Sequence, residues 1–292
     1  TKGEPPEIIR SLLGTGWLPE NGSDPQQLLD RIAPLLFEHS LFNGHPKFWG
    51  YITSSAAPIG ALGDLLASTI NPNVGAYNLS PVATEIERQT ISWIAELLGY
   101  PSDCGGLLVS GGNMANFVGF IVACHKQVPW NLREEGWNSK PPVSIYTSSE
   151  THGWVQKAAD MFGLGTSAIR WIPTDKQLRM KPETLIEWIS EDKANGVLPL
   201  MVIGTAGSVG TGAIDPLPEL AKICREHKLW LHADAAYGGF AAALHDSPAS
   251  LKALSLADSV AVDPHKWLYA PLEAGCTLVR DADFLKQTFS FH

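Results

Sequence analysis

The segment SVAVDPHKWLYAP (residues 259–271) opens as a buried strand and then places an imidazole and an amine side by side. Its apolar run 260–262 is typical of a parallel sheet, whose strands are covered on both faces. His265 and Lys266 come where this strand would end, and the aromatic and apolar side chains at 267–269 predict a cover that excludes water. Desolvation favours the neutral form of a lysine, so Lys266 is a candidate for Schiff-base chemistry.

A second His-Lys pair in the same chain serves as a comparison. His125 and Lys126 end the amphipathic pattern that predicts a helix over 113–127. Cations at the end of a helix complement its dipole and face water. We therefore interpret this pair as structural and keep only Lys266 as a candidate for chemistry.

Outward from 259–271, short apolar runs alternate with amphipathic helical patterns. The predicted strands lie at 107–110, 143–149, 198–207, 229–237, 259–263 and 276–281. The predicted helices lie at 25–40, 59–70, 80–100, 113–127, 152–163, 181–196 and 217–228. The alternation predicts an α/β fold with a mainly parallel sheet flanked by helices. Ligands of such sheets bind beyond the carboxyl ends of the strands.

Composition argues against several classes of protein. The 292 residues carry a net charge of −9, so nucleic acid is not expected as the main partner. No apolar run is long enough to span a membrane, and the N-terminus TKGEPPEIIR lacks the apolar region of a secretory signal. The four cysteines form no CxxC pair and the nine histidines no HExxH pattern, so we expect no metal site and a reducing, cytoplasmic location.

Three further candidates follow other predicted strands. Gly111 and Gly112 lie at a strand-to-helix turn, where the free N–H groups of the helix can cradle a phosphate; the alternative is an ordinary turn. His152 starts a predicted helix, where a cap or a surface residue is the alternative. Asp234 lies among alanines, and a buried carboxylate there needs a cation or several donors; the alternative is an N-cap or loop residue.

These candidates together match the needs of pyridoxal 5'-phosphate. Its phosphate requires an anion site such as a helix N-terminus, and its protonated pyridine nitrogen requires a carboxylate. Its aldehyde requires a lysine amine, which holds it as an imine. No single motif decides, but the combination in this order on an α/β pattern predicts this cofactor.

Six motifs resemble the group II pyridoxal-phosphate-dependent amino acid decarboxylases, which include the aromatic-L-amino-acid, histidine and glutamate decarboxylases. They are HPKFWGYI (45–52), SPVATEIE (80–87), SGGNMAN (110–116), GSVGTGAIDP (207–216), HADAAYGG (232–239) and DPHKWLY (263–269). The resemblance runs from about residue 25 to the end of the chain. It implies the aspartate-aminotransferase-like fold (PLP fold type I) and a homodimer with active sites at the subunit interface.

The resemblance also implies a domain organisation. An N-terminal helical dimerisation segment would cover residues 1–75 and a PLP-binding large domain residues 76–292. A mobile catalytic loop, usually carrying a tyrosine, would follow the segment TFSFH (288–292), and a small C-terminal domain would follow the loop. We therefore expect the catalytic loop and the C-terminal small domain to be absent from this chain.

Carried over by motif, the resemblance implies a role for each candidate. Lys266 would form the internal aldimine, with His265 flanking it. Asp234 would pair with the pyridine nitrogen, and Ala236 would lie against the ring. His152 would stack on the other face of the ring and take part in proton transfer.

The phosphate site that the resemblance implies departs from the family pattern at two positions. Gly112 and Asn113 would hold the phosphate. Met114 stands where many relatives have a glutamate, which binding through the backbone tolerates. Asp263 stands where several relatives have an asparagine near the phosphate. Because a carboxylate would repel a phosphate, we expect Asp263 to point away from it or to be paired.

Three functions remain open at this point. The first is a PLP-dependent carboxy-lyase that converts a small-molecule L-amino acid into an amine and carbon dioxide. The second is another reaction of the same cofactor, by an aminotransferase, an aldolase-type lyase or an aldehyde synthase. The third is a truncated, non-catalytic dimerisation module. Ala57 and Ala76 fall where the aromatic-acid enzymes place large rings, which weakens the prediction of a dopa-like substrate.

Overall fold

The computed structural model describes residues 4–14, 16, 18–48 and 50–290, which fall into two compact units, residues 1–51 and 52–292. Trp49 of the motif HPKFWGYI and the last two residues of TFSFH lie outside the described residues. The expected boundary at residue 75 concerns dimerisation, which contacts within one chain do not test, so it stays a prediction.

The first unit contains two helices, α1 (Pro6–Leu13) and α2 (Pro25–His39). The start of α2 matches the prediction at 25–40, because Asp24 accepts a hydrogen bond from the Gln27 N–H (3.0 Å) and Pro25 suits the first turn. Neither helix has a buried residue among those described.

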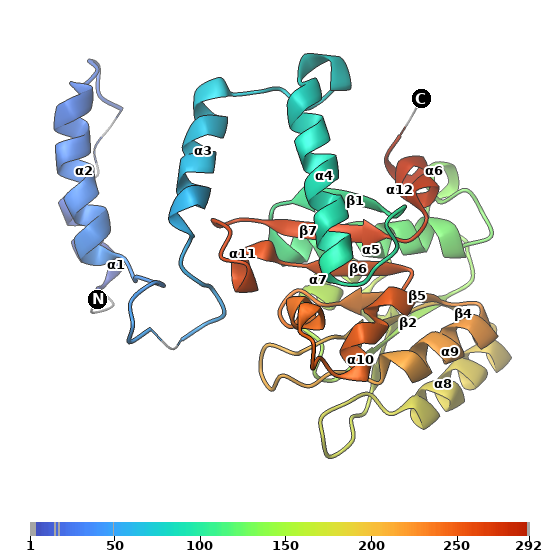
Figure 1. Cartoon of the computed structure of the whole chain (residues 1–292). Helices are drawn as coiled ribbons and strands as arrows, with labels where there is room; N and C mark the ends of the chain where they lie inside the picture. The colour runs from blue at the N-terminus through green and yellow to red at the C-terminus, as the bar shows by residue number, and fades with distance from the viewer. Residues whose placement is uncertain (1–3, 15, 17, 49, 291–292) are drawn as a thin grey trace. The chain divides into compact units, whose positions relative to one another are not determined.

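The second unit is built on a seven-stranded sheet with the order β1-β7-β6-β5-β4-β2-β3 (Figure 1). Its strands are β1 (Gly105–Val109), β2 (Val143–Ser148), β3 (Ile169–Ile172), β4 (Leu198–Thr205), β5 (Trp230–Asp234), β6 (Ser259–Val262) and β7 (Gly275–Val279). Neighbours pair in parallel except at β7, which is antiparallel to both β1 and β6. The predicted α/β class with a mainly parallel sheet is therefore confirmed.

One strand is absent from the sequence prediction. The edge strand β3 reads Ile-Arg-Trp-Ile, and its two central residues are only partly buried. An edge strand needs no continuous apolar run, so the pattern that predicted the central strands does not extend to it.

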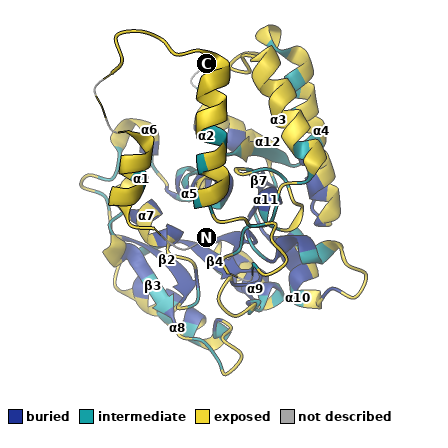
Figure 2. Cartoon of the chain, turned by 90° about the vertical axis from the view of Figure 1, so that its left-hand side faces the viewer, coloured by how far each residue is buried: buried dark blue, intermediate teal, exposed yellow. Residues whose placement is uncertain are grey.

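Helices cover both faces of this sheet, as Figure 2 shows by the dark blue strands and the yellow outer surfaces of the helices. One core contains side chains of α4 (Pro81–Leu97), α8 (Pro182–Ala194), α9 (Leu217–His227) and α10 (Ala249–Lys252). The other contains side chains of α5 (Gly111–Gln127), α6 (Leu132–Glu135), α7 (Trp154–Met161) and α12 (Ala282–Phe289). Two further helices, α3 (Pro58–Ile70) and α11 (Pro264–Trp267), precede α4 and follow β6.

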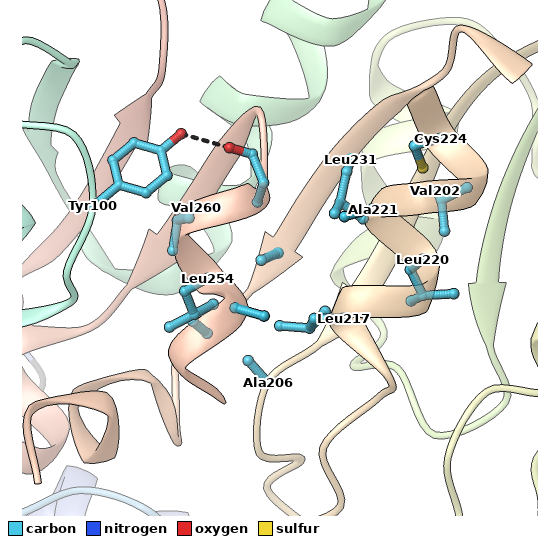
Figure 3. Packing of buried hydrophobic residues seen from close by; sticks show 14 of the residues in the cluster. Tyr100, Val202, Ala206, Leu217, Leu220, Ala221, Cys224, Leu231, Leu254 and Val260 are labelled. Atoms are coloured by element: carbon cyan, nitrogen blue, oxygen red, sulfur yellow. Dashed lines mark hydrogen bonds between the residues drawn. The ribbon is translucent and has the colours of Figure 1, made fainter. Parts of the chain in front are cut away.

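Apolar packing fixes the first core. Figure 3 shows Leu217 and Leu220 of α9 among side chains of the neighbouring strands and of Leu254. Tyr100 closes this core with its hydroxyl 3.0 Å from the carbonyl oxygens of Ala257 and Asp258. A buried hydroxyl without a partner would be costly, so these bonds let the ring enter the core.

The sheet order brings the carboxyl ends of six strands, all but β7, to one edge. β1 and β6 are parallel to each other because both are antiparallel to β7. The carboxyl ends of β1, β2, β3, β4, β5 and β6 therefore lie on the same side of the sheet. Each candidate site residue named from the sequence lies at or just after one of these ends, which makes this edge the place of the candidate site.

Candidate active site

Lys266 lies in the single turn α11 that follows β6, and it is paired with a buried carboxylate. Its Nζ lies 2.7 Å from Oδ2 of Asp263, and the side chains are 11% and 2% exposed. An ammonium this deep needs a compensating charge, which Asp263 supplies. Of the two expectations for Asp263, pairing is the one that the structure shows.

The predicted aromatic cover over Lys266 differs in the structure. Trp267, Leu268 and Tyr269 are 42%, 43% and 53% exposed, so they do not seal the amine within this chain. Only Trp267 has a described ring partner, the edge of Tyr237, with centroids 5.6 Å apart. The turn α11 ends at Trp267, so Leu268 and Tyr269 lie beyond it.

The glycine turn after β1 starts a helix of 17 residues, α5, at Gly111 rather than at Asn113 as predicted. Gly111 has a φ of +80°, which few other residues adopt. Gly112 has no room for a side chain, because a Cβ there would collide with the carboxylate of Asp263. The helix N-terminus of α5 and the lysine turn α11 therefore touch through Asp263. Asn113 is exposed one residue further along.

Asp234 ends β5 and is held by three N–H donors. The indole Nε1 of Trp154 donates to Oδ2 (2.7 Å), and the backbone N–H of Ala236 donates to Oδ1 (3.2 Å). The amide of Asn116 adds a longer bond to Oδ1 (3.4 Å). Donors of this kind stabilise a buried negative charge, which confirms that Asp234 is a buried, partnered carboxylate rather than a loop residue.

A directed chain of hydrogen bonds runs behind Asp234. Trp230 Nε1 donates to Ser259 Oγ (2.8 Å), and Ser259 lies 2.7 Å from Nδ1 of His232. Nε2 of His232 lies 2.8 Å from Oδ1 of Asn116, whose Nδ2 donates to the carbonyl of Gly112 (2.8 Å) and to Asp234. Only a neutral His232 with its proton on Nε2 lets Ser259 donate and Asn116 accept. The chain thus links Asp234 to the first turn of α5.

Burial keeps His232 neutral. It is completely buried, and desolvation lowers the pKa of its imidazole to about 4, although the charge of Asp234 opposes the shift. Gly119 makes this placement possible, because a Cβ there would lie 2.6 Å from the imidazole Cε1.

We expect His232 to make the protein acid-sensitive. Its pKa is about 4 in the folded state against an ordinary 6.5, so the unfolded state binds the proton first as the pH falls. The stabilisation is present above pH 6.5 and is lost as the pH falls to about 4, a change of about 3 kcal/mol.

The variant His232→Gln tests this expectation, because the amide can donate to Asn116 and accept from Ser259 without titrating. Urea unfolding of wild type and variant at both ends of this pH range gives the comparison. The wild type should lose about 3 kcal/mol more than the variant on acidification. Equal losses of unfolding free energy in the two proteins would contradict the neutral state assigned to His232.

The two remaining histidine predictions differ in their setting. His152 is exposed at the end of β2, and its Nδ1 accepts from the Trp154 N–H (3.3 Å). It lies two residues before the indole that holds Asp234. His265 is buried, with Nδ1 2.8 Å from the carbonyl oxygen of Ala274 and Nε2 4.0 Å from Oδ2 of Asp263.

A segment before α3 lies along the lysine turn. The hydroxyl of Ser54 donates to the His265 carbonyl (3.0 Å), and the N–H of Ala57 donates to the Tyr269 carbonyl (2.8 Å). Ala57, singled out from the sequence as a position beside the substrate, therefore lies next to the turn that carries Lys266. Ala76 is exposed and has no such contact among those described.

Sequence reasoning missed Trp154, Asn116, His232 and Ser259. One signal was present: His232 and Asp234 are two apart on a strand, so their side chains point to the same face. Trp154 offered no signal, since an apolar residue at a helix start reads as core. No motif predicts that Asn116 reaches across to β5.

The residues at this edge fit pyridoxal phosphate. The helix N-terminus at Gly112 is a candidate for the phosphate, and the buried Oδ1 of Asp263 beside it has no hydrogen-bond partner among the described residues. Asp234 offers an oriented carboxylate for the pyridine nitrogen, and Lys266 offers an amine for the aldehyde. The fold and the site define an α/β protein of the pyridoxal-phosphate-binding class.

Comparison with known proteins gives the family. A family model, the pyridoxal-dependent decarboxylase conserved domain, matches residues 7–292. The chain therefore belongs to the pyridoxal-dependent decarboxylases, as the motifs predicted.

The relatives cover the chain almost completely. It is 37% identical to the aromatic-L-amino-acid decarboxylase of Bacillus atrophaeus over 97% of its own length and 57% of that protein. The apo structure of mouse CSAD superposes with a TM-score of 0.91 at 31% identity, over 98% of this chain and 59% of that one. The 4-hydroxyphenylacetaldehyde synthase of Rhodiola rosea gives a TM-score of 0.89 at 27% identity, over 98% and 62%. The chain thus spans about three fifths of the length of these proteins.

Proposed function

We propose that the protein decarboxylates an L-amino acid, releasing carbon dioxide and the corresponding amine, with pyridoxal phosphate as its cofactor. The observation that carries this proposal is the meeting of Lys266, Asp234 and the α5 N-terminus at one sheet edge in a chain of this family. The whole polypeptide would supply whatever part of the site lies outside these residues.

Each residue has a part in this proposal. When bound, pyridoxal phosphate supplies a protonated ring that accepts the electron pair of the bond broken at the substrate Cα. Lys266 would supply the amine that binds the aldehyde. Asp234, fixed by Trp154 and the Ala236 N–H, keeps the proton on the pyridine nitrogen. Gly112 and Asn113 would bind the phosphate through their N–H groups, and His152, which is exposed, would contact the ring.

The proposal is tested by incubating the complete polypeptide and the 292-residue chain with pyridoxal phosphate and each common amino acid. Carbon dioxide and primary amine should appear in equal amounts with one substrate class. Binding of the cofactor without carbon dioxide from any amino acid would sink the proposal.

A second candidate reaction is oxidative aldehyde formation, supported by the similarity to the Rhodiola rosea aldehyde synthase. The two reactions share the release of carbon dioxide and differ in the second product. An amine supports decarboxylation, whereas an aldehyde with ammonia, formed with consumption of dioxygen and release of hydrogen peroxide, supports the synthase.

We also infer that the protein is a homodimer. In α3 every residue from 61 to 70 is exposed, and Figure 2 shows the helix almost entirely in yellow. Its Ile59, Leu62, Leu65, Leu66 and Ile70 are all at least 60% exposed, and Asp64 is its sole charged residue. A helix that is apolar on all sides is normally buried. We infer that a second copy of the chain covers α3, which agrees with the prediction that residues 1–75 form a dimerisation segment.

Replacing Leu66 by lysine should weaken this dimer. A charge placed in an apolar interface typically costs more than 1 kcal/mol, so the dissociation constant should rise roughly tenfold or more. Light scattering after size exclusion measures the mass. Leu244→Lys is the matched control, because Leu244 is 57% exposed and lies outside α3. If Leu66→Lys left the dimer unaffected, α3 would not be part of the dimer interface.

The part of the chain that the structure describes contains no helix long and apolar enough to cross a membrane. All four cysteines are free. Free thiols persist in a reducing compartment, which supports a cytoplasmic location.

A further inference from the structure

His152, the proposed contact to the cofactor ring, is exposed but lies between two buried residues, Thr151 and Trp154. The imidazole has a single bond among those described, from the Trp154 N–H to its Nδ1 (3.3 Å). This bond holds the ring only from the side that follows it in the chain. The position of His152 therefore also depends on how firmly the chain is held at Thr151.

The hydroxyl of Thr151 is the centre of a buried cluster of hydroxyl groups. Thr147 of β2 donates to it (2.6 Å), and the hydroxyl of Thr205 at the end of β4 lies 3.1 Å away. The hydroxyl of Ser148 is more distant, at 3.4 Å. Because each hydroxyl has one proton, Thr151 accepts from Thr147 and donates to Thr205, the nearer of the other two. Buried hydroxyl groups need such partners, so the cluster anchors the chain just before His152.

Thr205 connects this anchor to the strand that carries Asp234. The two residues are direct partners in the register of β4 with β5. The N–H of Thr205 donates to the buried carboxylate of Asp215 (2.7 Å), and the N–H of Asp215 donates back to the carbonyl of Thr205 (2.9 Å). Thr205 is thus fixed on both sides, and its bond to Thr151 relates His152 to the level of the sheet at which Asp234 lies.

Trp154 is held independently of this cluster. Its indole is completely buried and contacts the rings of Phe120 and His232, with centroids 6.2 and 5.7 Å away. Apolar packing of this kind does not depend on a hydroxyl group. Loss of the Thr151 hydroxyl should therefore loosen His152 while Trp154 stays in place.

We propose that Thr151 is a positioning residue whose hydroxyl sets the place of the His152 imidazole against the cofactor ring. Thr151 is buried and acts through His152. A group that is held in place before binding loses less conformational freedom on binding, so the contact to the ring becomes more favourable. This inference rests on the proposed use of pyridoxal phosphate.

Thr151→Val tests the proposal, because it keeps the shape of the side chain and removes the hydroxyl. We expect the dissociation constant of pyridoxal phosphate, measured by visible absorbance in the full polypeptide, to rise about threefold or more as the ring contact weakens. The kcat of carbon dioxide release should fall roughly tenfold. Thr151→Ser retains the hydroxyl and should restore both values.

Tyr146→Phe is the matched control. It removes a buried hydroxyl from the same strand, β2, where that hydroxyl donates to Asp192 (2.7 Å) rather than to the cluster at Thr151. The loss of stability should be of the same kind, but the affinity for the cofactor and kcat should stay unchanged.

A His152→Ala background shows whether Thr151 acts through His152. In that background Thr151→Val should change the dissociation constant by less than about twofold, since the group that it positions is gone. Equal effects in both backgrounds, or no effect of Thr151→Val alone, would overturn the inference while leaving the cofactor in place. If the wild type shows no visible band with pyridoxal phosphate, the proposed function fails and the inference with it.

A second variant covers the case in which Thr151→Val does not fold, as judged by circular dichroism. Thr205→Val removes the other end of the same hydrogen bond and leaves Thr151 itself unchanged. It should weaken cofactor binding in the same direction and show the same dependence on His152. An effect that persists in the His152→Ala background would overturn the inference here as well.

Discussion

Replacing Lys266 by alanine should abolish the visible absorbance of bound pyridoxal phosphate and lower decarboxylation by roughly 10³-fold or more. The reason is chemical: among the described residues at this edge, Lys266 is the amine that the structure buries at a strand end and pairs with a carboxylate. Absorbance spectra with added cofactor and assays of carbon dioxide release measure the two effects. A variant that keeps the visible band would place the cofactor on another amine.

The chain supplies a matched control for this variant. Lys126 also follows a histidine, but it lies at the end of α5, where its Nζ sits 3.9 Å from the ring centroid of Phe284. Lys126→Ala should leave both the band and the activity unchanged. The different settings of two identical dipeptides then account for the difference in chemistry.

Loss of Lys266 also leaves Asp263 buried without its cation. Breaking a buried pair in this way costs about 3 kcal/mol of folding stability. The double variant Lys266→Ala/Asp263→Asn should recover most of that stability without recovering the band. Urea unfolding therefore separates the structural part of the substitution from the chemical part.

Asp234→Asn is expected to have the second large effect. Both oxygens of Asp234 now accept hydrogen bonds, one from Trp154 Nε1–H and the other from the Ala236 N–H. An amide has only one such oxygen, so its NH₂ group would face one of these two donors. The unpaired donor costs about 2 kcal/mol of stability. Loss of the charge that holds the pyridine proton should lower kcat/KM by roughly 10²–10³-fold.

Trp154→Phe serves as the comparison for this variant. It removes the 2.7 Å bond to Oδ2 but leaves the charge of Asp234 in place. We expect about a tenfold loss of kcat/KM, because a hydrogen bond to a charged group contributes about 1.5 kcal/mol. If Asp234→Asn lost no more activity than Trp154→Phe, orientation rather than charge would be the contribution of Asp234.

Much of the fold could be predicted from local patterns. The central strands are covered on both faces and therefore appear as continuous apolar runs, which is why β4, β5 and β6 were recognised. The edge strand β3 was not recognised, because half-buried residues interrupt its pattern. Helix α2 was located to within a residue, because the helical spacing of its apolar residues is a local pattern in the sequence.

The sequence by itself determined the class of fold and the positions of Lys266, Asp234 and the glycine turn, because each follows a strand end and strand ends are local signals. Only the tertiary structure decided what surrounds them. Asn116 reaches Asp234, Trp154 holds it, and Asp263 joins Lys266 to Gly112. Most of these contacts join segments far apart in the chain, brought together by sheet order and packing, which no periodicity within a segment encodes. For the same reason the exposure of α3 appears only when the chain is folded.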